Sequence, residues 1–296
     1  MHGILLVDKP KNISSHGVVG KLRRHLNTKA IGHTGTLDPM ATGLLVILVG
    51  ECTKLSNYIM AQDKVYDAEV TFGIATNSDD AEGEITETVP MPSLKKNELE
   101  RALEKFIGPQ KQRPPVFSAI SVNGERLYKK ARRGEIVEVP ERDIEIMKIS
   151  ILDVSSERCV LRIHCSKGTY IRSIARDLGI ALGGVAHLSA LRRIRSGQFE
   201  VSEAVTLKTS AEEMRDKMSV YRKESLGLPL LQLDKMSARD LSHGKTLGLS
   251  RFEHLPEQMP ALAYYGDEIW AIVDQKDDQV VVKRGFGKQV EDSEAL

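Results

Sequence analysis

The sequence predicts an α+β fold with a small second domain at the C-terminal end. Short strand-like segments, with alternating or continuous apolar residues, are interspersed with amphipathic helical segments between residues 3 and about 200. Leu228-Pro229 and Asp234 then mark a boundary, and further short strand-like segments follow it. The length of 296 residues suits one large and one small domain, and a hydrophobic fraction of 41% suffices for a core.

The N-terminal part supplies the first strands and helices. Ser14 or Ser15 can cap a helix whose apolar face runs from Val18 to Leu26. We expect residues 74–93, which are acidic and contain prolines, to form a surface loop. The strands predicted here are residues 3–7, the continuous apolar run 44–49, and residues 66–72, in which apolar and polar residues alternate.

The middle and C-terminal parts of the chain also contain both predicted helices and predicted strands. A helix is predicted at residues 94–107 and another near 170–182, which end at Gly108-Pro109 and Gly183-Gly184. Residues 109–140 are basic and contain the turn signal Asn123-Gly124. Further strands are predicted at residues 116–122, 144–153, 158–166, 261–265, 268–274 and 279–283.

One run of residues stands out from these elements. It reads Gly32-His33-Thr34-Gly35-Thr36-Leu37-Asp38-Pro39-Met40-Ala41-Thr42-Gly43, directly before an apolar strand. Glycines let the backbone approach a ligand closely, and Pro39 biases Asp38 toward an extended conformation. A tight turn with a capping Asp is the alternative that composition alone favours. The run does not match a phosphate-binding Walker loop, which requires Lys and then Ser or Thr after its second glycine.

The same run resembles the catalytic motif of the TruB-type tRNA pseudouridine synthases. Four further segments resemble motifs of this family in the same order, so the resemblance spans residues 3 to about 200. These segments are Gly3-Ile4-Leu5-Leu6-Val7-Asp8-Lys9-Pro10 followed by Ser14-Ser15, Asp63-Lys64-Val65-Tyr66, Cys165-Ser166-Lys167-Gly168-Thr169-Tyr170-Ile171-Arg172-Ser173, and His187 to Arg193.

The resemblance implies a fold and a domain organisation. Residues 1–230 would form the pseudouridine synthase catalytic domain, with a mixed, mainly antiparallel central sheet flanked by helices. The basic block at about 109–140 would be an inserted segment that clamps RNA. Residues 235–296 resemble a PUA domain, a small β-barrel that binds RNA in this family. The acidic later part of this domain argues against strong phosphate binding by it.

The resemblance also implies an activity, the conversion of uridine 55 in the T arm of tRNA to pseudouridine. The N1–C1′ bond breaks, the base turns, and C5 joins C1′ without any redox step, so we expect no cofactor and no metal. Asp38 is the candidate nucleophile or base. Arg172 would keep that carboxylate charged through a two-point grip, and Tyr66 would stack on the target base.

Five more residues are expected to bind the substrate. By resemblance, Tyr170 and Leu191 are walls of the pocket, and His33 stabilises the RNA loop once the target base has flipped out. Lys9 and Lys64 would contact phosphates or the loop. The residues alone are equally compatible with ordinary core positions for the tyrosine and leucine, a locally bonded histidine, and solvated lysines.

Charge is distributed unevenly along a chain whose net charge is only +1. Residues 109–133 and 160–195 each contain seven Lys or Arg against one acid. Residues 74–104 contain three basic against eight acidic residues, and residues 253–296 contain four against ten. Two basic blocks suggest a one-sided positive groove for nucleic acid, although solvated helix faces would give the same counts.

Cysteine usage and hydropathy bear on location. The three cysteines form no CxxC pair, and Cys159 and Cys165 fit buried positions on one strand face. No apolar stretch is longer than about six residues, and no secretory signal is present at the N-terminus. We therefore expect a cytoplasmic monomer that binds tRNA without a guide RNA and does not bind membranes.

Three other functions remain open. An RNA-binding or RNA-folding protein without catalysis is one, although the intact set Asp38, Tyr66 and Arg172 argues against it. The guide-RNA-dependent catalytic subunit of a ribonucleoprotein lacks the basic insertion that residues 109–140 supply. A base-excising hydrolase would use Asp38 with an activated water. The competitors of Asp38 on composition are Asp8, Asp63 and Asp177.

Overall fold

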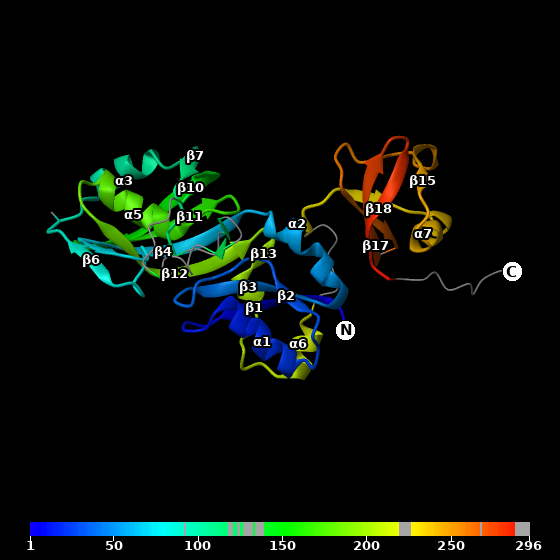
Figure 1. The fold of residues 1–296 in the computed structure, drawn as a ribbon, viewed down its shortest axis with the longest axis horizontal. Coiled ribbons are helices and arrows are strands. Elements are labelled where there is room, and N and C mark those ends of the chain that lie inside the picture. The colour runs from blue at the N-terminus through cyan, green and yellow to red at the C-terminus, as the bar shows by residue number, and fades with distance from the viewer. Residues whose placement is uncertain are drawn as a thin grey trace.

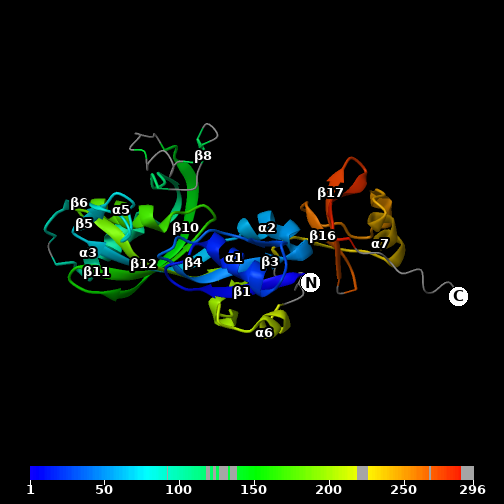
Figure 2. The same ribbon diagram turned by 60° about the horizontal axis from the view of Figure 1, so that its bottom comes forward.

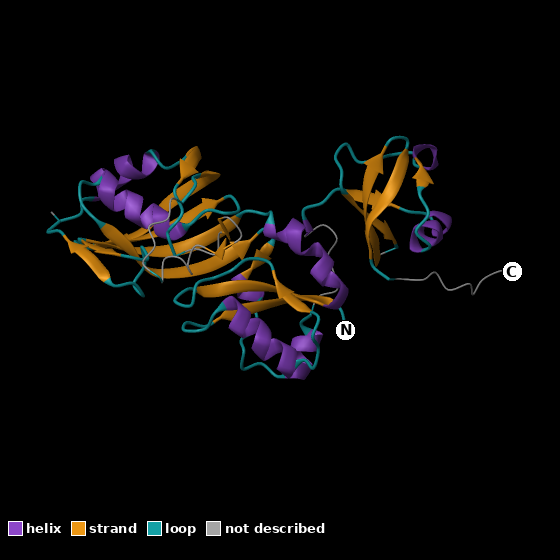
Figure 3. Cartoon of the chain, in the orientation of Figure 1, coloured by secondary structure: helices purple, strands orange, loops and turns teal. Residues whose placement is uncertain are grey.

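The chain forms a large body and a smaller C-terminal body, each built around its own sheet (Figure 1). The computed structural model describes residues 1–91, 93–117, 121–122, 125–126, 133, 139–218, 226–266 and 268–287. Helices pack against strands in both bodies (Figure 3). The predicted α+β class is confirmed.

The central sheet of the large body has nine strands. They are β1 (Gly3–Lys9), β2 (Ile31–His33), β3 (Thr42–Val49), β4 (Lys64–Phe72), β7 (Gly108–Gln112), β10 (Arg142–Val154), β11 (Arg158–Cys165), β12 (Ala186–Ser196) and β13 (Phe199–Glu200). The main path runs β1-β3-β12-β4-β11-β10-β7, with β2 paired to β3 and β13 paired to β12. Only β3 and β12 pair in parallel, so the sheet is mixed and mainly antiparallel, as predicted.

Burial along the strands follows the sequence pattern. Strand β3 is covered on both faces, which explains its continuous apolar run. Strand β4 buries Tyr66 and every second residue after it, while the residues between them are half-exposed. On β11, Cys159 and Cys165 are fully buried, and this burial raises the pKa of each thiol to about 12. They serve as small apolar core residues, as expected.

Helices cover the sheet in two groups. Within the described ranges, the helices of the large body are α1 (Ser15–His25), η1 (Gly50–Leu55), α2 (Ser56–Met60), α3 (Lys96–Glu104), α5 (Ile171–Ala181), η2 (Val201–Glu203) and α6 (Ala211–Asp216). Helices α3 and α5 pack on the β4, β11 and β10 part of the sheet, and α1 and α6 pack on β1 and β3 (Figures 1 and 2). Of the two candidate caps of α1, Ser14 accepts the N–H of Gly17 at 3.0 Å, which leaves Ser15 for another contact.

The structure corrects two expectations for the middle of the chain and adds detail to a third. Residues 74–93 are not loop throughout, because β5 (Ile74–Thr76) and β6 (Ile85–Thr88) pair antiparallel. Residues 109–112, the first residues of the basic block expected to clamp RNA, belong to β7 at the edge of the central sheet, where they pair with β10. Within residues 116–122, Val116 and Phe117 form a bend instead of a strand, residues 118–120 lie outside the described residues, and β8 (Ser121–Val122) pairs with β9 (Glu125–Arg126). The expected Asn123-Gly124 turn lies outside the described residues.

The C-terminal body is a five-stranded sheet with one helix against it. Its strands follow the order β14-β16-β17-β18-β15, and the strands predicted in this part of the chain are confirmed. Its elements are β14 (Leu230–Gln232), α7 (Lys235–Ser242), β15 (Leu247–Gly248), η4 (Leu249–Arg251), β16 (Ala261–Tyr265), β17 (Glu268–Lys276) and β18 (Gln279–Gly285). The expected boundary at residue 230 thus falls inside the second sheet.

A shared apolar cluster joins the two bodies. Leu262 and Ile272 of the small sheet are fully buried in the same cluster as Leu48 of β3 and Leu55 of η1. Buried apolar contact, rather than the connecting chain alone, therefore holds the small sheet to the large one. None of the helices in the described ranges combines the length and hydrophobicity required to cross a membrane.

Candidate active site

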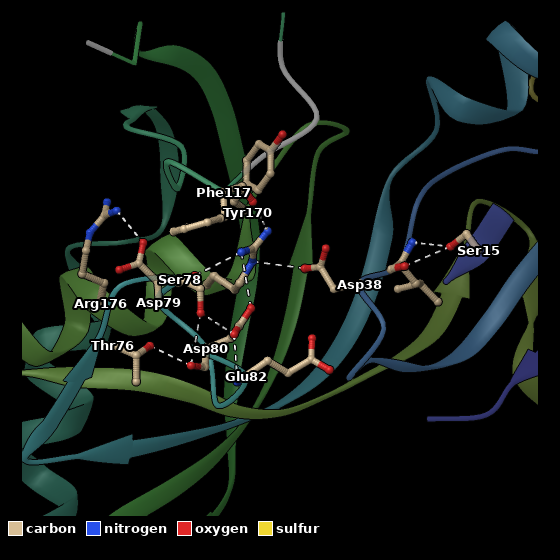
Figure 4. A network of polar contacts seen from close by, with 12 residues as sticks. Ser15, Asp38, Thr76, Ser78, Asp79, Asp80, Glu82, Phe117, Tyr170 and Arg176 are labelled. Carbon is tan, nitrogen blue, oxygen red and sulfur yellow. Dashed lines mark hydrogen bonds and ion pairs between the residues drawn. The ribbon is translucent and has the colours of Figure 1, made fainter. Parts of the chain in front are cut away.

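Asp38 lies in the loop that connects β2 to β3, and α1 fixes the backbone beside it. The hydroxyl of Ser15 donates to the carbonyl of Leu37 at 3.0 Å and accepts the N–H of Leu37 at 2.7 Å (Figure 4). Two bonds to one buried residue leave this part of the loop little freedom to move. The start of a helix thereby positions the candidate catalytic carboxylate.

Arg193 holds the same loop from the side of β12. Its side chain is buried, and it donates to the carbonyl of Leu44 at 2.7 Å and to that of Gly35 at 3.1 Å. The loop returns to β3 at Gly43, which has a φ of +98°, and a Cβ there would lie 2.3 Å from the Arg193 carbonyl oxygen. Only glycine permits this approach, so the last glycine of the motif serves the parallel pairing of β3 with β12.

Arg172, the second residue of α5, is the cation beside Asp38. Its Nε lies 3.1 Å from Oδ2 of Asp38 (Figure 4). The arginine side chain is only 6% exposed, whereas the Asp38 side chain is 35% exposed. A buried guanidinium thus supports a carboxylate that solvent or a ligand can still reach.

The expected two-point grip on Asp38 is wrong, because the guanidinium divides its contacts among several partners. Its Nη1 donates to the carbonyl of Ser78 at 3.0 Å and lies 3.3 Å from Oδ2 of Asp80. Its Nη2 donates to the carbonyl of Phe117 at 3.0 Å. Two chain segments, residues 78–80 and Phe117, therefore engage Nη1 and Nη2, and the contact with Asp38 is made by Nε.

The surroundings of Asp38 raise its pKa above the ordinary value. Burial is the largest cause, since it disfavours the charged form. Arg172 opposes this effect, the neighbouring Asp80 carboxylate adds to it, and Lys9 opposes it weakly. A carboxylate with a raised pKa is a better proton acceptor than an ordinary one, and active sites commonly contain such groups.

Tyr66 lies on β4 between β11 and β12, opposite Arg193 in the register with β12. It is 8% exposed, and burial raises the pKa of its hydroxyl, an effect that the positive charge of Arg193 partly offsets. The phenol therefore stays neutral near pH 7. A neutral, fixed phenol offers a ring face for stacking and a hydroxyl for proton transfer.

These groups share one cavity of about 780 Å³. Its walls include Asp38, Tyr66 and Arg172, the three predicted catalytic residues. Tyr170 and Leu191 also line it, as expected for walls of a pocket. Ligand sites commonly enclose about 300–1,000 Å³, so the cavity has the size of a binding site.

Lys9 does not fit the expected contact with phosphate or an RNA loop. Its side chain is fully buried and its ammonium points into the protein. There it donates to the carbonyls of Pro10, Ile13 and Pro39 at 3.0, 2.7 and 3.3 Å. Burial lowers its pKa to about 8, and Asp38 partly offsets that change. Lys9 anchors the loop that carries Asp38.

The substrate-binding roles of Lys64 and His33 remain predictions, and the structure shows what each side chain contacts. Lys64 lines the cavity but donates to the carbonyls of Met60, at 2.7 Å, and Gln62, and burial lowers its pKa to about 8. His33 is outside the cavity wall, and its Nδ1 accepts the N–H of Gly35 at 3.3 Å. Burial lowers the pKa of His33, which favours the neutral ring.

Asp80 is the residue that sequence reasoning missed. It is 4% exposed, and its Oδ1 accepts bonds from the hydroxyl of Ser78 at 2.6 Å and the N–H of Glu82 at 3.0 Å (Figure 4). Its other oxygen faces Arg172. Asp80 lies in an acidic stretch whose sequence predicts a surface loop. No local sequence pattern distinguishes it from the acidic residues around it.

The other aspartates that could compete with Asp38 are engaged in ion pairs. Asp8 forms a two-point pair with Arg192 at 3.0 and 2.7 Å. Asp63 contacts Arg195 at 3.1 Å and also His164, and Asp177 pairs with its neighbour Arg176 at 2.8 Å. None of the three lines the cavity around Arg172. Asp38 is the one candidate that combines the glycine-rich loop with that cavity.

Comparison with known protein families agrees with this geometry. Residues 23–171 match the family model of the TruB family pseudouridylate synthase (N terminal domain). Residues 172–236 match the tRNA pseudouridylate synthase B C-terminal domain. The chain belongs to the TruB family. The two matched segments together contain Asp38, Tyr66 and Arg172.

Curated relatives carry the same family name. The tRNA pseudouridine synthase B of Xanthomonas campestris pv. campestris (strain B100) is 46% identical over 207 residues, which cover 70% of this chain and 67% of that protein. That of Opitutus terrae is also 46% identical, over 70% of this chain and 86% of that protein. That of Xylella fastidiosa is 43% identical over 240 residues, 79% of this chain and 80% of that protein.

Solved structures share the fold at lower identity. The protein chain of an H/ACA RNP bound to a substrate RNA containing 2′-deoxyuridine superposes with a TM-score of 0.73 at 22% identity, covering 96% of this chain and 84% of that one. A chain of a Cbf5-Nop10-Gar1 complex gives a TM-score of 0.74 at 24% identity, with the same coverage. The small C-terminal sheet is included in these superpositions, so this TruB-family chain shares its overall architecture with them.

Proposed function

We propose that this TruB-family protein is a stand-alone tRNA pseudouridine synthase that converts uridine 55 in the T arm of tRNA to pseudouridine. It acts as a monomer, without a guide RNA and without a cofactor. Asp38 is the nucleophile or base, with Arg172 and Tyr66 beside it. The large body forms the catalytic domain, and the small C-terminal body forms a PUA-like module that contacts RNA.

The observation that carries this proposal is the contact between Asp38 and Arg172 at the wall of the cavity. The carboxylate is partly exposed toward the cavity, while the guanidinium behind it is buried and held by two carbonyls. Tyr66 supplies an aromatic ring within the same enclosure. A carboxylate, a cation and a ring around a space of nucleotide size suit a reaction at the junction of a sugar and a base.

The chemistry balances with these groups alone. The bond from N1 to C1′ breaks, the base turns, and a new bond joins C5 to C1′. C5 loses one proton and N1 gains one, so no oxidant, reductant or water is consumed. Asp38 begins the reaction as nucleophile or base, and its raised pKa favours proton transfer near neutral pH. Tyr66, which lines the same cavity, is the residue we assign to assist the proton that leaves C5.

The enclosed position of Asp38 requires that the target base leave its stack. A base inside a folded RNA arm cannot reach a carboxylate in a cavity, and flipping it out exposes both N1 and C1′. The basic block at about 109–140, which begins within β7 at the edge of the central sheet, is suited to hold the RNA backbone during this step. The T arm, a stem with a loop, is the substrate element that such an arrangement fits.

The decisive experiment uses purified protein and an unmodified tRNA transcript with no other RNA present. Pseudouridine should form at position 55 alone, and a transcript with cytidine at that position should yield none. The absence of product would reject the stand-alone activity. Product that appears only after a guide RNA is added would assign the protein to the ribonucleoprotein class instead. Release of free uracil would indicate a base-excising hydrolase.

A further inference from the structure

Five cations line the active-site cavity, and three of them are engaged by the protein itself. Arg172, Arg193 and Lys64 donate to backbone carbonyls, as described above. The remaining two are Arg142, the first residue of β10, and Lys167, which follows β11. Within the described ranges, neither of these two side chains has a hydrogen bond or an ion pair.

Arg142 is held by stacking rather than by an acceptor. Its guanidinium carbon lies 5.4 Å from the centroid of the Tyr170 ring. The Tyr170 backbone is itself clamped by the Gln112 amide, through bonds of 3.0 and 2.8 Å. The Nε of Arg142 is buried and has no partner among the residues the structure describes. A buried donor without an acceptor is rare, because the hydration that it gives up is not replaced.

The neighbouring acid does not neutralise Arg142. Asp143 is 88% exposed at its side chain and pairs with Lys111 at 3.0 Å, on β7. Asp143 also lines the cavity, but Lys111 engages its carboxylate, and no ion pair joins it to Arg142 among the described residues. Arg142 therefore lines the cavity without an acid that compensates its charge among the described residues.

Lys167 lies in the turn that runs along Arg142. A Cβ placed on the next residue, Gly168, would lie 3.5 Å from Nη1 of Arg142. The Lys167 side chain is exposed and lines the same cavity. Both cations line one cavity, so an anion bound there is attracted by both. A phosphate diester fits this pair, because Arg binds its oxygens bidentately and Lys adds a point charge.

We propose that Arg142 and Lys167 form a phosphate-binding site in the cavity, which grips a backbone phosphate next to the target uridine. This proposal rests on the proposed function and names how the same cavity holds its nucleotide. A flipped nucleotide carries its flanking phosphates toward the cavity. Binding one of them against the Tyr170 wall would place the attached sugar and base at a set distance from Asp38 and Tyr66.

The test is a double-mutant cycle between one side chain and one phosphate. The RNA is a T-arm stem-loop with a single neutral methylphosphonate, either 5′ or 3′ of the target uridine. Affinity is measured with Asp38→Asn protein, so that turnover does not interfere. We expect one of the two positions to weaken binding about tenfold to a hundredfold, the range for a hydrogen bond to a charged group. The same methylphosphonate should cost clearly less in Arg142→Ala and in Lys167→Ala, because each variant retains only one of the two cations.

Matched controls separate this site from general charge loss. Arg101→Ala removes an exposed arginine on α3, outside the cavity, and should leave the full methylphosphonate effect in place. Lys167→Ala changes an exposed residue, so it tests the proposal even if Arg142→Ala disturbs folding. Undiminished methylphosphonate losses at both positions in these variants would overturn the site. Coupling of only one of the two residues would overturn the shared site. Affinity is read without catalysis, so a failure of the proposed reaction is distinguishable from a failure of this site.

Discussion

Replacement of Asp38 by Asn separates chemistry from binding in this protein. The amide keeps the shape of the side chain and its position 3.1 Å from Arg172, but it lacks the charge of a nucleophile or base. We expect turnover to fall by about 10⁴-fold or more, as when a general base or nucleophile is removed. The affinity for tRNA should stay within a few-fold of wild type, because every cation that faces the cavity is retained.

The same substitution should raise stability at neutral pH. At 3.1 Å the Coulomb attraction between Asp38 and Arg172 is about 1 kcal/mol at the dielectric constant of water and about 5 kcal/mol at an effective value near 20. Because the Asp38 side chain is 35% exposed, solvent screening brings the attraction closer to the lower figure. Burial and Asp80 outweigh this attraction, since the pKa of Asp38 is raised. The charged carboxylate therefore costs stability at neutral pH.

The sign of the pH dependence follows from linkage. A carboxyl group whose folded pKa lies above its unfolded value binds protons more tightly in the folded state, so stability falls as the pH rises through these values. The stability gained by Asp38→Asn should be largest at neutral pH. It should disappear as the pH falls toward the ordinary value of 3.8. Thermal unfolding at the two ends of this range measures the difference.

Turnover is best followed by the release of tritium from C5 of labelled uridine, because this hydrogen leaves when C5 joins C1′. The matched control is Asp177→Asn, which removes a carboxylate on α5 that pairs with Arg176 outside the cavity. The control should retain activity. Residual turnover of the Asp38 variant above about one per cent of wild type, beyond what deamidation explains, would refute the assignment of the catalytic role to Asp38.

Three further predictions concern Arg172, the basic insertion and the apolar cluster shared by the two sheets. Arg172→Lys should lower kcat by about 10²-fold or more, because one ammonium cannot hold Asp38, Asp80 and two carbonyls in place. A normal kcat, or an equal loss of kcat in the control Arg176→Lys, would contradict this role. Neutralising the basic cluster of the insertion should weaken tRNA binding and reduce the slope of log K against log salt by about 0.7–0.9 for each phosphate that the protein no longer neutralises. An unchanged slope would show that these side chains are solvated and do not contact the RNA. This cluster is Lys129, Lys130, Arg132 and Arg133. Ile272→Ala should lower the free energy of unfolding by about 2–5 kcal/mol, because it removes buried atoms from the cluster shared by both sheets. The control Ile180→Ala, on the exposed side of α5, should have little effect. Equal melting temperatures of the two variants would show that the shared cluster does not stabilise the protein.

Local sequence patterns predict several elements of this fold correctly. The alternation at residues 66–72 predicts a strand with one buried face, and β4 has that face because neighbouring residues of a strand point to opposite sides. The apolar run at 44–49 becomes the fully covered β3 for the same local reason. The catalytic loop is identifiable because its residues are contiguous, so the resemblance to the TruB family can be read directly from them.

Contacts between distant residues cannot be read in this way. Lys9 is a lysine near the catalytic motif, and only the tertiary structure shows that three carbonyls enclose its ammonium. Asp80 lies within an acidic stretch, and only the return of that stretch against α5 brings it to Arg172. The prediction of a two-point grip is wrong because the partners of a guanidinium depend on which segments surround it.

The sequence by itself determined which residues form strands, which loop carries the carboxylate and which family the chain resembles, because each of these is encoded in neighbouring residues. Only the tertiary structure decided which cations face the protein and which face the cavity. The same folding joined the small sheet to β3 through a buried cluster and left the Nε of Arg142 without an acceptor among the described residues. The physical reason is that hydrogen-bond partners and burial are set by segments far apart in the chain, whose meeting is a property of the packed fold.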